Sequence, residues 1–100
     1  GGATVHPRSV EVVLEALPGV SGAAVVGIPD DVWGEAVVAL IVLDPAGQAD
    51  PKAVMAQARE RLSASELPRR IEFVDSFPLT ANGKTDRDSV RALFLGLSHA

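Results

Sequence analysis

One lysine stands in a setting that suits chemistry on phosphate or carboxylate oxygens. Lys84 is one of two lysines in the chain, and it follows Asn82 and Gly83 in a segment rich in turn-forming residues. Glycine allows the left-handed backbone that can present the next side chain outward. An ammonium group placed there can stabilise charge that develops on a phosphoryl or carboxylate oxygen and needs no partner base. Position alone also fits a solvated surface lysine.

Two further places could contact a ligand. Trp33 lies in a predicted loop beside Gly34, where its indole ring could stack on a nucleotide base or complete the core. Arg69 and Arg70 follow Pro68 and could bind a phosphate group through paired N–H donors. A pair of arginines at the start of a strand also fits a solvated sheet edge.

The residue types exclude several other chemistries. The chain has no cysteine, and its two histidines, His6 and His99, lie near opposite ends of the sequence. We therefore predict no thiolate nucleophile, no serine–histidine pair and no metal site. No glycine-rich phosphate-binding loop of the usual kinds is present. Carboxylates on predicted helices or helix ends are expected to face water, and these are Glu11, Glu15, Glu60 and Glu66.

The composition is that of one compact domain. The chain has 100 residues, of which 47% are hydrophobic and 22% charged, and its net charge is −4. A negative net charge disfavours binding that depends on neutralising nucleic-acid phosphates. The longest apolar run, residues 36–43, is too short to cross a bilayer, and no signal peptide is evident. A cytoplasmic protein is the simplest interpretation.

Local patterns predict three helices. Apolar residues with helical spacing follow Pro7 and end at Pro18-Gly19, which predicts a helix over residues 7–17. Asp50 and Pro51 predict the start of a second helix, which ends before Pro68. A third helix should follow the loop, with Thr85 and Asp88 in the spacing of a capping box at its start. Its predicted apolar stripe consists of Val90, Leu93, Phe94 and Leu97.

Three segments read as strands. Residues 22–28 and 36–43 are short, β-branched apolar runs that predict buried strands, and residues 71–74 alternate like a strand with one solvated face. Residues 75–84 read as a polar loop. The order of elements lacks regular β–α–β alternation, so we predict an α+β domain in which a sheet of about three strands is covered by three helices.

A longer motif surrounds Lys84 and resembles a known family. Residues 78–87 read P-x-T-x-x-G-K-x-x-R, which resembles the last core motif of the adenylate-forming enzymes, the superfamily of acyl- and aryl-CoA synthetases and peptide-synthetase adenylation domains. Residues 1–11, with Gly1-Gly2, resemble the segment after the hinge between the two domains of that family. The resemblance extends over nearly the whole chain through Pro18-Gly19-Val20, Gly27-x-Pro29-Asp30, Trp33-Gly34-Glu35, Pro68-Arg69 and Phe73-Val74-Asp75.

The resemblance implies that residues 1–100 are the C-terminal lid domain of a larger ligase, inactive alone, whose N-terminal domain binds ATP, Mg2+ and a fatty or aryl carboxylic acid. Such enzymes form an acyl adenylate, release pyrophosphate, and then turn the lid so that a thiol displaces AMP. Lys84 would be the catalytic residue of the first step. The implied cofactor-binding residues, for ATP or CoA, are Gly1, Gly2, Trp33, Arg69 and Gly83.

The thiol acceptor divides the alternatives. The Gly1-Gly2 to Pro7 segment is more similar to CoA ligases than to peptide-synthetase domains, which favours CoA. A lid that serves the phosphopantetheine arm of a carrier protein, and a binding module of the same fold without catalysis, remain the alternatives. Ser65 and Glu66 depart from the aromatic and basic residues usual in the family, and they place a negative charge where a phosphate-rich thiol would approach.

Overall fold

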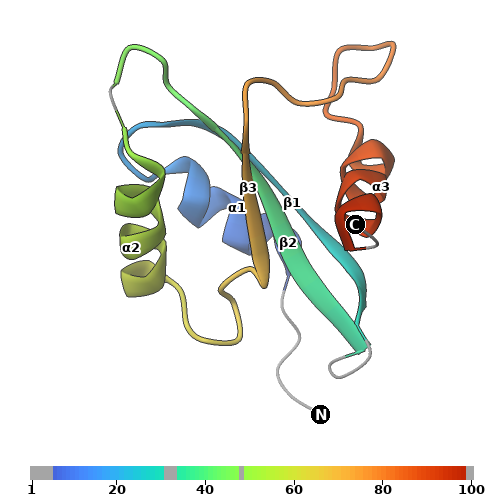
Figure 1. The fold of residues 1–100 in the computed structure, drawn as a ribbon, viewed down its shortest axis with the longest axis horizontal. Coiled ribbons are helices and arrows are strands. Elements are labelled where there is room, and N and C mark those ends of the chain that lie inside the picture. Colours follow the sequence, from blue (N-terminus) through green and yellow to red (C-terminus); the bar gives the residue numbers. More distant parts are fainter. Residues whose placement is uncertain (1–5, 31–33, 48, 99–100) are drawn as a thin grey trace.

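A computed structural model describes residues 6–30, 34–47 and 49–98 (Figure 1). Three helices and three strands are present in these ranges. In chain order they are α1 (Pro7–Glu15), β1 (Val20–Asp30), β2 (Gly34–Leu43), α2 (Pro51–Arg61), β3 (Arg70–Val74) and α3 (Arg87–Ser98). The predicted α+β class, with three helices on a small sheet, is confirmed.

The three strands form one mixed sheet with β2 in the centre. β1 pairs with β2 in antiparallel fashion, and β3 runs parallel to β2 on its other side. The antiparallel pairing continues to the pair Asp30 and Gly34, so β1 and β2 are longer than the predicted 22–28 and 36–43. The strands extend beyond the apolar runs that predicted them, because backbone hydrogen bonding between β1 and β2 continues past those runs.

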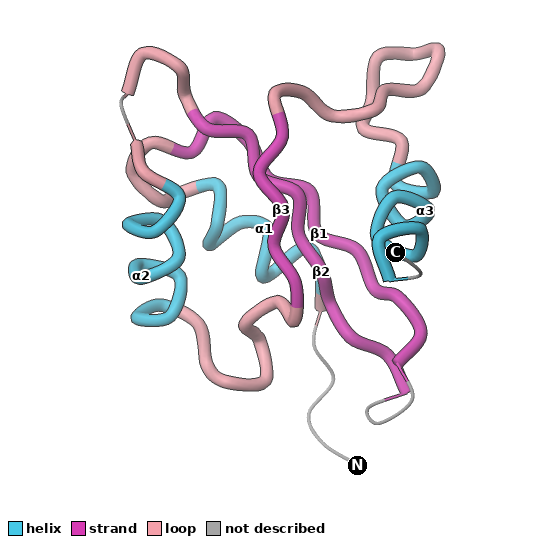
Figure 2. Tube along the Cα trace, viewed as in Figure 1, coloured by secondary structure: helices cyan, strands magenta, loops and turns pink. Residues whose placement is uncertain are grey.

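The helices cover both faces of the sheet, with α1 and α2 on one face and α3 on the other (Figures 1 and 2). Alternate residues of β1 and β2 point to opposite faces, which explains why both strands read as continuous apolar runs. The first face packs against Val10 and Leu14 of α1, Val54 and Ala58 of α2, and Leu17 and Leu62, which follow these helices. The second packs against Val90 and Phe94 of α3, both fully buried.

Proline and a side-chain cap begin the first two helices. Pro7 occupies the first turn of α1, which has no side-chain cap, and α1 ends at Glu15, two residues before the predicted end at Leu17. Asp50 caps α2, because its carboxylate accepts a hydrogen bond of 2.9 Å from the Lys52 amide. α2 ends at Arg61 because Leu62 adopts an extended backbone.

Candidate functional site

The segment that carries Lys84 folds as a small hairpin. Leu79 and Thr85 form an antiparallel bridge, and the Thr80 amide donates to the Lys84 carbonyl at 2.7 Å. The Gly83 amide closes a turn by donating to the Thr80 carbonyl at 2.9 Å, and Gly83 has a φ of 82°. A side chain at that φ would strain the backbone, which accounts for glycine here. We call residues 79–85 the Lys84 hairpin.

Lys84 faces solvent near the tip of this hairpin. The four residues before it and Lys84 itself are exposed. Its amide donates to the Thr80 hydroxyl at 3.3 Å, so the backbone at Lys84 is held while the side chain points away from the core. No described residue forms an ion pair with the Lys84 ammonium. The charge is therefore available to a ligand.

The base of the Lys84 hairpin joins directly to α3. The Asp86 amide donates to the Pro78 carbonyl at 2.8 Å, which closes the hairpin below the Leu79–Thr85 bridge. The Asp86 carboxylate also accepts hydrogen bonds from the Ser89 amide at 3.2 Å and the Ser89 hydroxyl at 2.9 Å. Asp86 is thus the helix cap, and the predicted capping box of Thr85 and Asp88 is wrong. Thr85 instead belongs to the hairpin bridge.

Arg87, the last residue of the motif, ties this base to α1. Its two terminal nitrogens, Nη1 and Nη2, donate to the two carboxylate oxygens of Glu11, each at 3.0 Å. Glu11 is 3% exposed, so the expectation that it faces water is wrong. The pattern missed this pair because periodicity reports only on neighbours within one helix. One sequence feature could have suggested the pair: Glu11 lies between the core residues Val10 and Leu14, and the motif of residues 78–87 supplies an arginine, Arg87, as a partner.

The same pair satisfies the free edge of β1. The Val25 amide donates to Glu11 Oε2 at 2.9 Å, and the Val25 carbonyl accepts from Arg87 Nη1 at 3.1 Å. β1 is an edge strand, so these groups have no neighbouring strand to pair with. At Val25, the Glu11 carboxylate and the Arg87 guanidinium make the two hydrogen bonds that a neighbouring strand would otherwise make. Arg91, one turn along α3, donates to the Gly27 carbonyl at 3.3 Å in the same way.

Both charges of the pair are stabilised. Burial would raise the pKa of the Glu11 carboxyl, but hydrogen bonds from Arg87, the Val25 amide and Arg8, with the charge of Arg87, bring that pKa below its ordinary value. The Glu11 hydrogen bonds raise the pKa of the Arg87 guanidinium in spite of its partial burial. The ion pair therefore persists across the physiological pH range.

Arg69, a candidate ligand residue that the structure describes, lies away from Lys84. Arg69 precedes β3 and the Lys84 hairpin follows it, so the two lie toward opposite ends of that strand. Arg69 is exposed, and its backbone amide donates a hydrogen bond of 2.9 Å to the Val37 carbonyl. This contact lies toward the end of the sheet where β1 ends and β2 begins. Gly83 lies in the hairpin turn next to Lys84. Gly1, Gly2 and Trp33 lie outside the described residues.

Glu66, one of the departures from the family pattern, is engaged locally. Its carboxylate accepts hydrogen bonds from the amide of Ser63 at 3.0 Å and from the hydroxyl of Ser63 at 2.8 Å. These bonds lower the pKa of Glu66, so it carries its negative charge at neutral pH. Glu66 stands three residues before Arg69 in the sequence.

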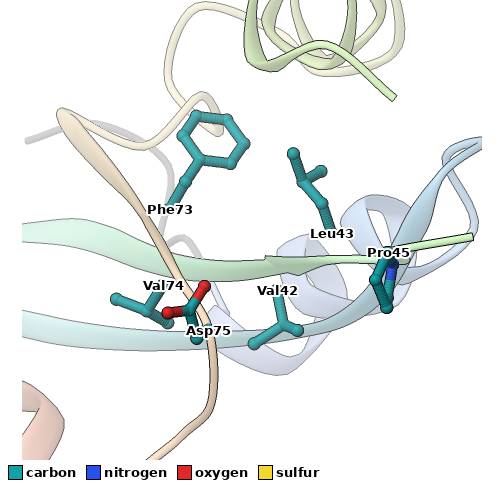
Figure 3. Close-up of a pocket in the computed structure, with 6 residues that line it drawn as sticks. All are labelled: Val42, Leu43, Pro45, Phe73, Val74 and Asp75. Atoms are coloured by element: carbon teal, nitrogen blue, oxygen red, sulfur yellow. The ribbon is translucent and has the colours of Figure 1, made fainter. Parts of the chain in front are cut away.

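A shallow hollow lies over the carboxyl ends of β2 and β3 (Figure 3). Its volume is about 450 Å³, and Leu43 and Phe73 extend from one side of the sheet while Val42 and Val74 extend from the other. Asp75 contributes the one carboxylate of its lining. An open, apolar lining with a single charge gives no arrangement for catalysis, and Lys84 does not line it.

The described part of the chain contains neither a metal-binding cluster nor a helix that could span a membrane. No group of three or more histidine, aspartate or glutamate side chains within residues 6–30, 34–47 and 49–98 is arranged to hold a metal ion. None of the helices in those ranges is long and apolar enough to span a bilayer.

Comparison with known proteins identifies relatives along most of the chain. The medium/long-chain-fatty-acid–CoA ligase FadD8 of Mycobacterium tuberculosis is 43% identical over 101 residues, which cover 94% of this chain and 18% of that protein. The fatty acid–[acyl-carrier-protein] ligase ScoC of Streptomyces coeruleorubidus is 42% identical over 95 residues, which cover 95% of this chain and 18% of that protein. The chain thus spans less than a fifth of the length of these relatives.

A solved structure agrees with the sequence relatives. The amide bond synthetase McbA from Marinactinospora thermotolerans superposes with a TM-score of 0.78 and 46% identity, and the match covers 90% of this chain and 18% of that one. Residues 9–84 match the family described as the AMP-binding enzyme C-terminal domain. That range ends on Lys84 and includes Glu11. The chain therefore belongs to the AMP-binding enzyme C-terminal domain family of the adenylate-forming superfamily, as its motifs predicted.

Proposed function

We propose that this chain is the C-terminal domain of a larger AMP-forming acid–thiol ligase, in which Lys84 serves the adenylation step. The observation that carries the proposal is an ammonium group, without an ion-pair partner among the described residues, near the tip of a hairpin whose base is tied to the sheet. A cation held in this way suits the stabilisation of charge on reacting oxygens. The relatives named as ligases of fatty acids supply the class of reaction.

In the first step, a carboxylate oxygen of the acid attacks the α-phosphorus of ATP, and the bond to pyrophosphate breaks. Lys84 would lie between the attacking carboxylate and the phosphate oxygens, where its positive charge offsets the negative charge of both. An N-terminal domain would bind the acid and ATP with Mg2+, since the described residues of this chain form no cluster of metal ligands. This domain contributes the lysine.

In the second step, a thiol attacks the acyl carbon of the adenylate and AMP leaves. We assign this step to another face of the domain, because Arg69 and Lys84 lie toward opposite ends of β3. Gly1, Gly2, Trp33 and Arg69 are the residues proposed to contact CoA. A domain with two functional faces would turn between the steps. Use of ATP and CoA would place the ligase in the cytoplasm.

A carrier protein is the second candidate acceptor. ScoC, named as a fatty acid–[acyl-carrier-protein] ligase, is nearly as similar to this chain as FadD8. The negative charge of Glu66 near Arg69 also disfavours a phosphate-rich acceptor at that place. The first candidate remains CoA, because the Gly1-Gly2 segment is more similar to CoA ligases.

The experiment uses the full-length gene product with ATP and a panel of fatty and aryl carboxylic acids. Acid-dependent release of pyrophosphate is the first readout, and consumption of free CoA in competition with a carrier protein that bears phosphopantetheine is the second. Acid-dependent pyrophosphate release with CoA consumption supports the proposal. Release with CoA ignored assigns the carrier protein as acceptor. Absence of release with every acid would contradict a ligase and leave a binding module of this fold.

A further inference from the structure

The base of the Lys84 hairpin is connected to two distant parts of the domain by one side chain. Arg87 donates to both carboxylate oxygens of Glu11 in α1 and to the Val25 carbonyl in β1. Glu11 is buried and its carboxylate also accepts from the Val25 amide at 2.9 Å. Its remaining partner is Arg8, whose guanidinium donates at 2.6 Å. Arg87 is thus held in one orientation by acceptors on two elements.

Lys84 lies close enough to this anchor to depend on it. Three residues of extended chain span at most about 11 Å, so the α-carbons of Lys84 and Arg87 are no farther apart than that. The intervening backbone has no freedom to absorb a shift, because Thr85 is bridged to Leu79 and Asp86 is bonded to Pro78. A displacement of Arg87 would therefore move the hairpin as one unit.

We propose that Arg87 and Glu11 are positioning residues for Lys84, and the proposal rests on the function assigned above. The paired hydrogen bonds between Arg87 and Glu11 fix the position of the base of the Lys84 hairpin relative to α1 and β1. They thereby fix the position that the Lys84 ammonium can reach. Neither residue touches the reacting atoms in this account. Phe77, packed against the core on the α3 face, holds the other arm of the chain that leads into the hairpin.

A purely stabilising role would not require this arrangement. Burying the Glu11 carboxylate costs hydration, so an ion pair at such a place is often no more stabilising than apolar residues of similar volume. A guanidinium–carboxylate fork has a fixed planar geometry, so it defines a direction as well as a contact. That property suits a contact that orients a side chain three residues away in the sequence.

Arg91 provides a matched control on the same helix. Like Arg87 it donates to a β1 carbonyl, that of Gly27, and the two side chains are equally exposed at 43%. Its carboxylate partner, however, is Asp88 on α3 itself, so it does not connect the helix to α1. It also lies one turn farther from the hairpin. Arg91→Gln therefore removes a similar contact without disturbing the base of the Lys84 hairpin.

The test compares Arg87→Gln, Arg87→Lys, Arg91→Gln and Lys84→Ala in the full-length protein. Acid-dependent ATP–pyrophosphate exchange measures the first step, and thioester formation from a supplied acyl adenylate measures the second. We expect Arg87→Gln to lower exchange on the order of 10²-fold, as a misplaced catalytic group does, while thioester formation stays near that of the parent protein. Arg87→Lys, which keeps the charge and loses the fork, should fall between. Arg91→Gln should leave both steps unchanged.

A second readout does not depend on catalysis. Hydrogen exchange of the amides in residues 79–85 should become faster in Arg87→Gln and Arg87→Lys and stay unchanged in Arg91→Gln. Equal losses in both half-reactions would overturn the proposal in favour of a merely structural role, and so would unchanged exchange of the hairpin amides. If Arg87→Gln does not fold, Arg87→Lys decides by the same criteria.

Failure of the inference can be told apart from failure of the function. If Lys84→Ala loses ATP–pyrophosphate exchange and Arg87→Gln keeps it at the parent rate, the proposed function of Lys84 is supported and the positioning role of Arg87 is overturned. Normal exchange in Lys84→Ala would overturn the proposed function itself, and with it the role of Arg87 and Glu11 in catalysis.

Discussion

Glu11 and Arg87 are 76 residues apart in the sequence, yet their side chains meet in two parallel hydrogen bonds of 3.0 Å at the free edge of β1. The contact joins α1, β1 and the start of α3. Since α3 follows directly from the Lys84 hairpin, this pair also marks where the candidate catalytic segment is attached to the domain.

Loss of the Arg87 side chain should destabilise the domain moderately. Arg87→Gln leaves the buried Glu11 carboxylate with Arg8 and the Val25 amide, and removes the donor to the Val25 carbonyl. We expect a decrease of about 1–3 kcal/mol in the free energy of unfolding, as is usual for buried polar groups left without a partner. Urea denaturation followed by circular dichroism measures it. A decrease equal to that of Arg91→Gln would contradict the special role of the pair.

The Glu11 pair should make stability depend on pH in the acid range. Because the pKa of folded Glu11 lies below its ordinary value of 4.5, ionised Glu11 stabilises the fold above that value. The stabilisation should disappear as the pH falls from 4.5 through the lower pKa of the folded state. The difference in unfolding free energy between the parent domain and Glu11→Gln, measured by urea denaturation between neutral and acid pH, should shrink over that window. A constant difference would show that the carboxylate charge contributes nothing.

Phe94 should be the side chain on which the attachment of α3 depends most. It is fully buried against the sheet, and Val90 is its neighbour one turn earlier. Phe94→Ala should lower the free energy of unfolding by about 3–5 kcal/mol, since it removes a large side chain and leaves a cavity. Leu95→Ala, at a position 38% exposed on the same helix, serves as control and should cost far less. Similar losses in both variants would contradict the described packing of α3.

Two glycines should respond oppositely to alanine. Gly83 has a φ of 82° with open space around it, so Gly83→Ala suffers from backbone strain alone, about 1–2 kcal/mol. Gly96 lies in α3, also with open space, and Gly96→Ala should stabilise by about 0.5–1 kcal/mol because alanine favours a helix. Thermal unfolding of both variants tests the signs. A stabilised Gly83→Ala variant would contradict the turn described for the Lys84 hairpin.

Local sequence patterns predicted the helices and strands, but they did not predict all of the ends and caps of these elements. Apolar periodicity located the three helices and three strands, because each element buries a stripe or a face that its sequence displays. The ends of β1 were missed because pairing with β2 continues through polar Asp30. The capping box was misassigned because Thr85 is drawn into the hairpin bridge with Leu79, a contact that helix rules do not include. A partner outside the helix, such as Leu79, is not visible to rules that consider helical spacing alone.

At the candidate site, too, the sequence predicted the local features and missed a contact between distant residues. The type and spacing of residues 78–87 were enough to single out Lys84 and to place it in a turn beside Gly83. The burial of Glu11 could not be read from its helix, because a carboxylate on an amphipathic helix normally faces water. Only the fold reveals that an arginine three residues beyond Lys84 compensates that charge.

Lys84 is proposed to act in the adenylation step, and the two lysines of the chain allow a direct test. Lys52, exposed in the first turn of α2 on the other face of the sheet from α3, is the matched control. In the full-length protein, Lys84→Ala should lower acid-dependent ATP–pyrophosphate exchange by orders of magnitude and largely preserve thioester formation from a supplied acyl adenylate, while Lys52→Ala changes neither. Pyrophosphate exchange by Lys84→Ala at the rate of the parent protein would contradict the account.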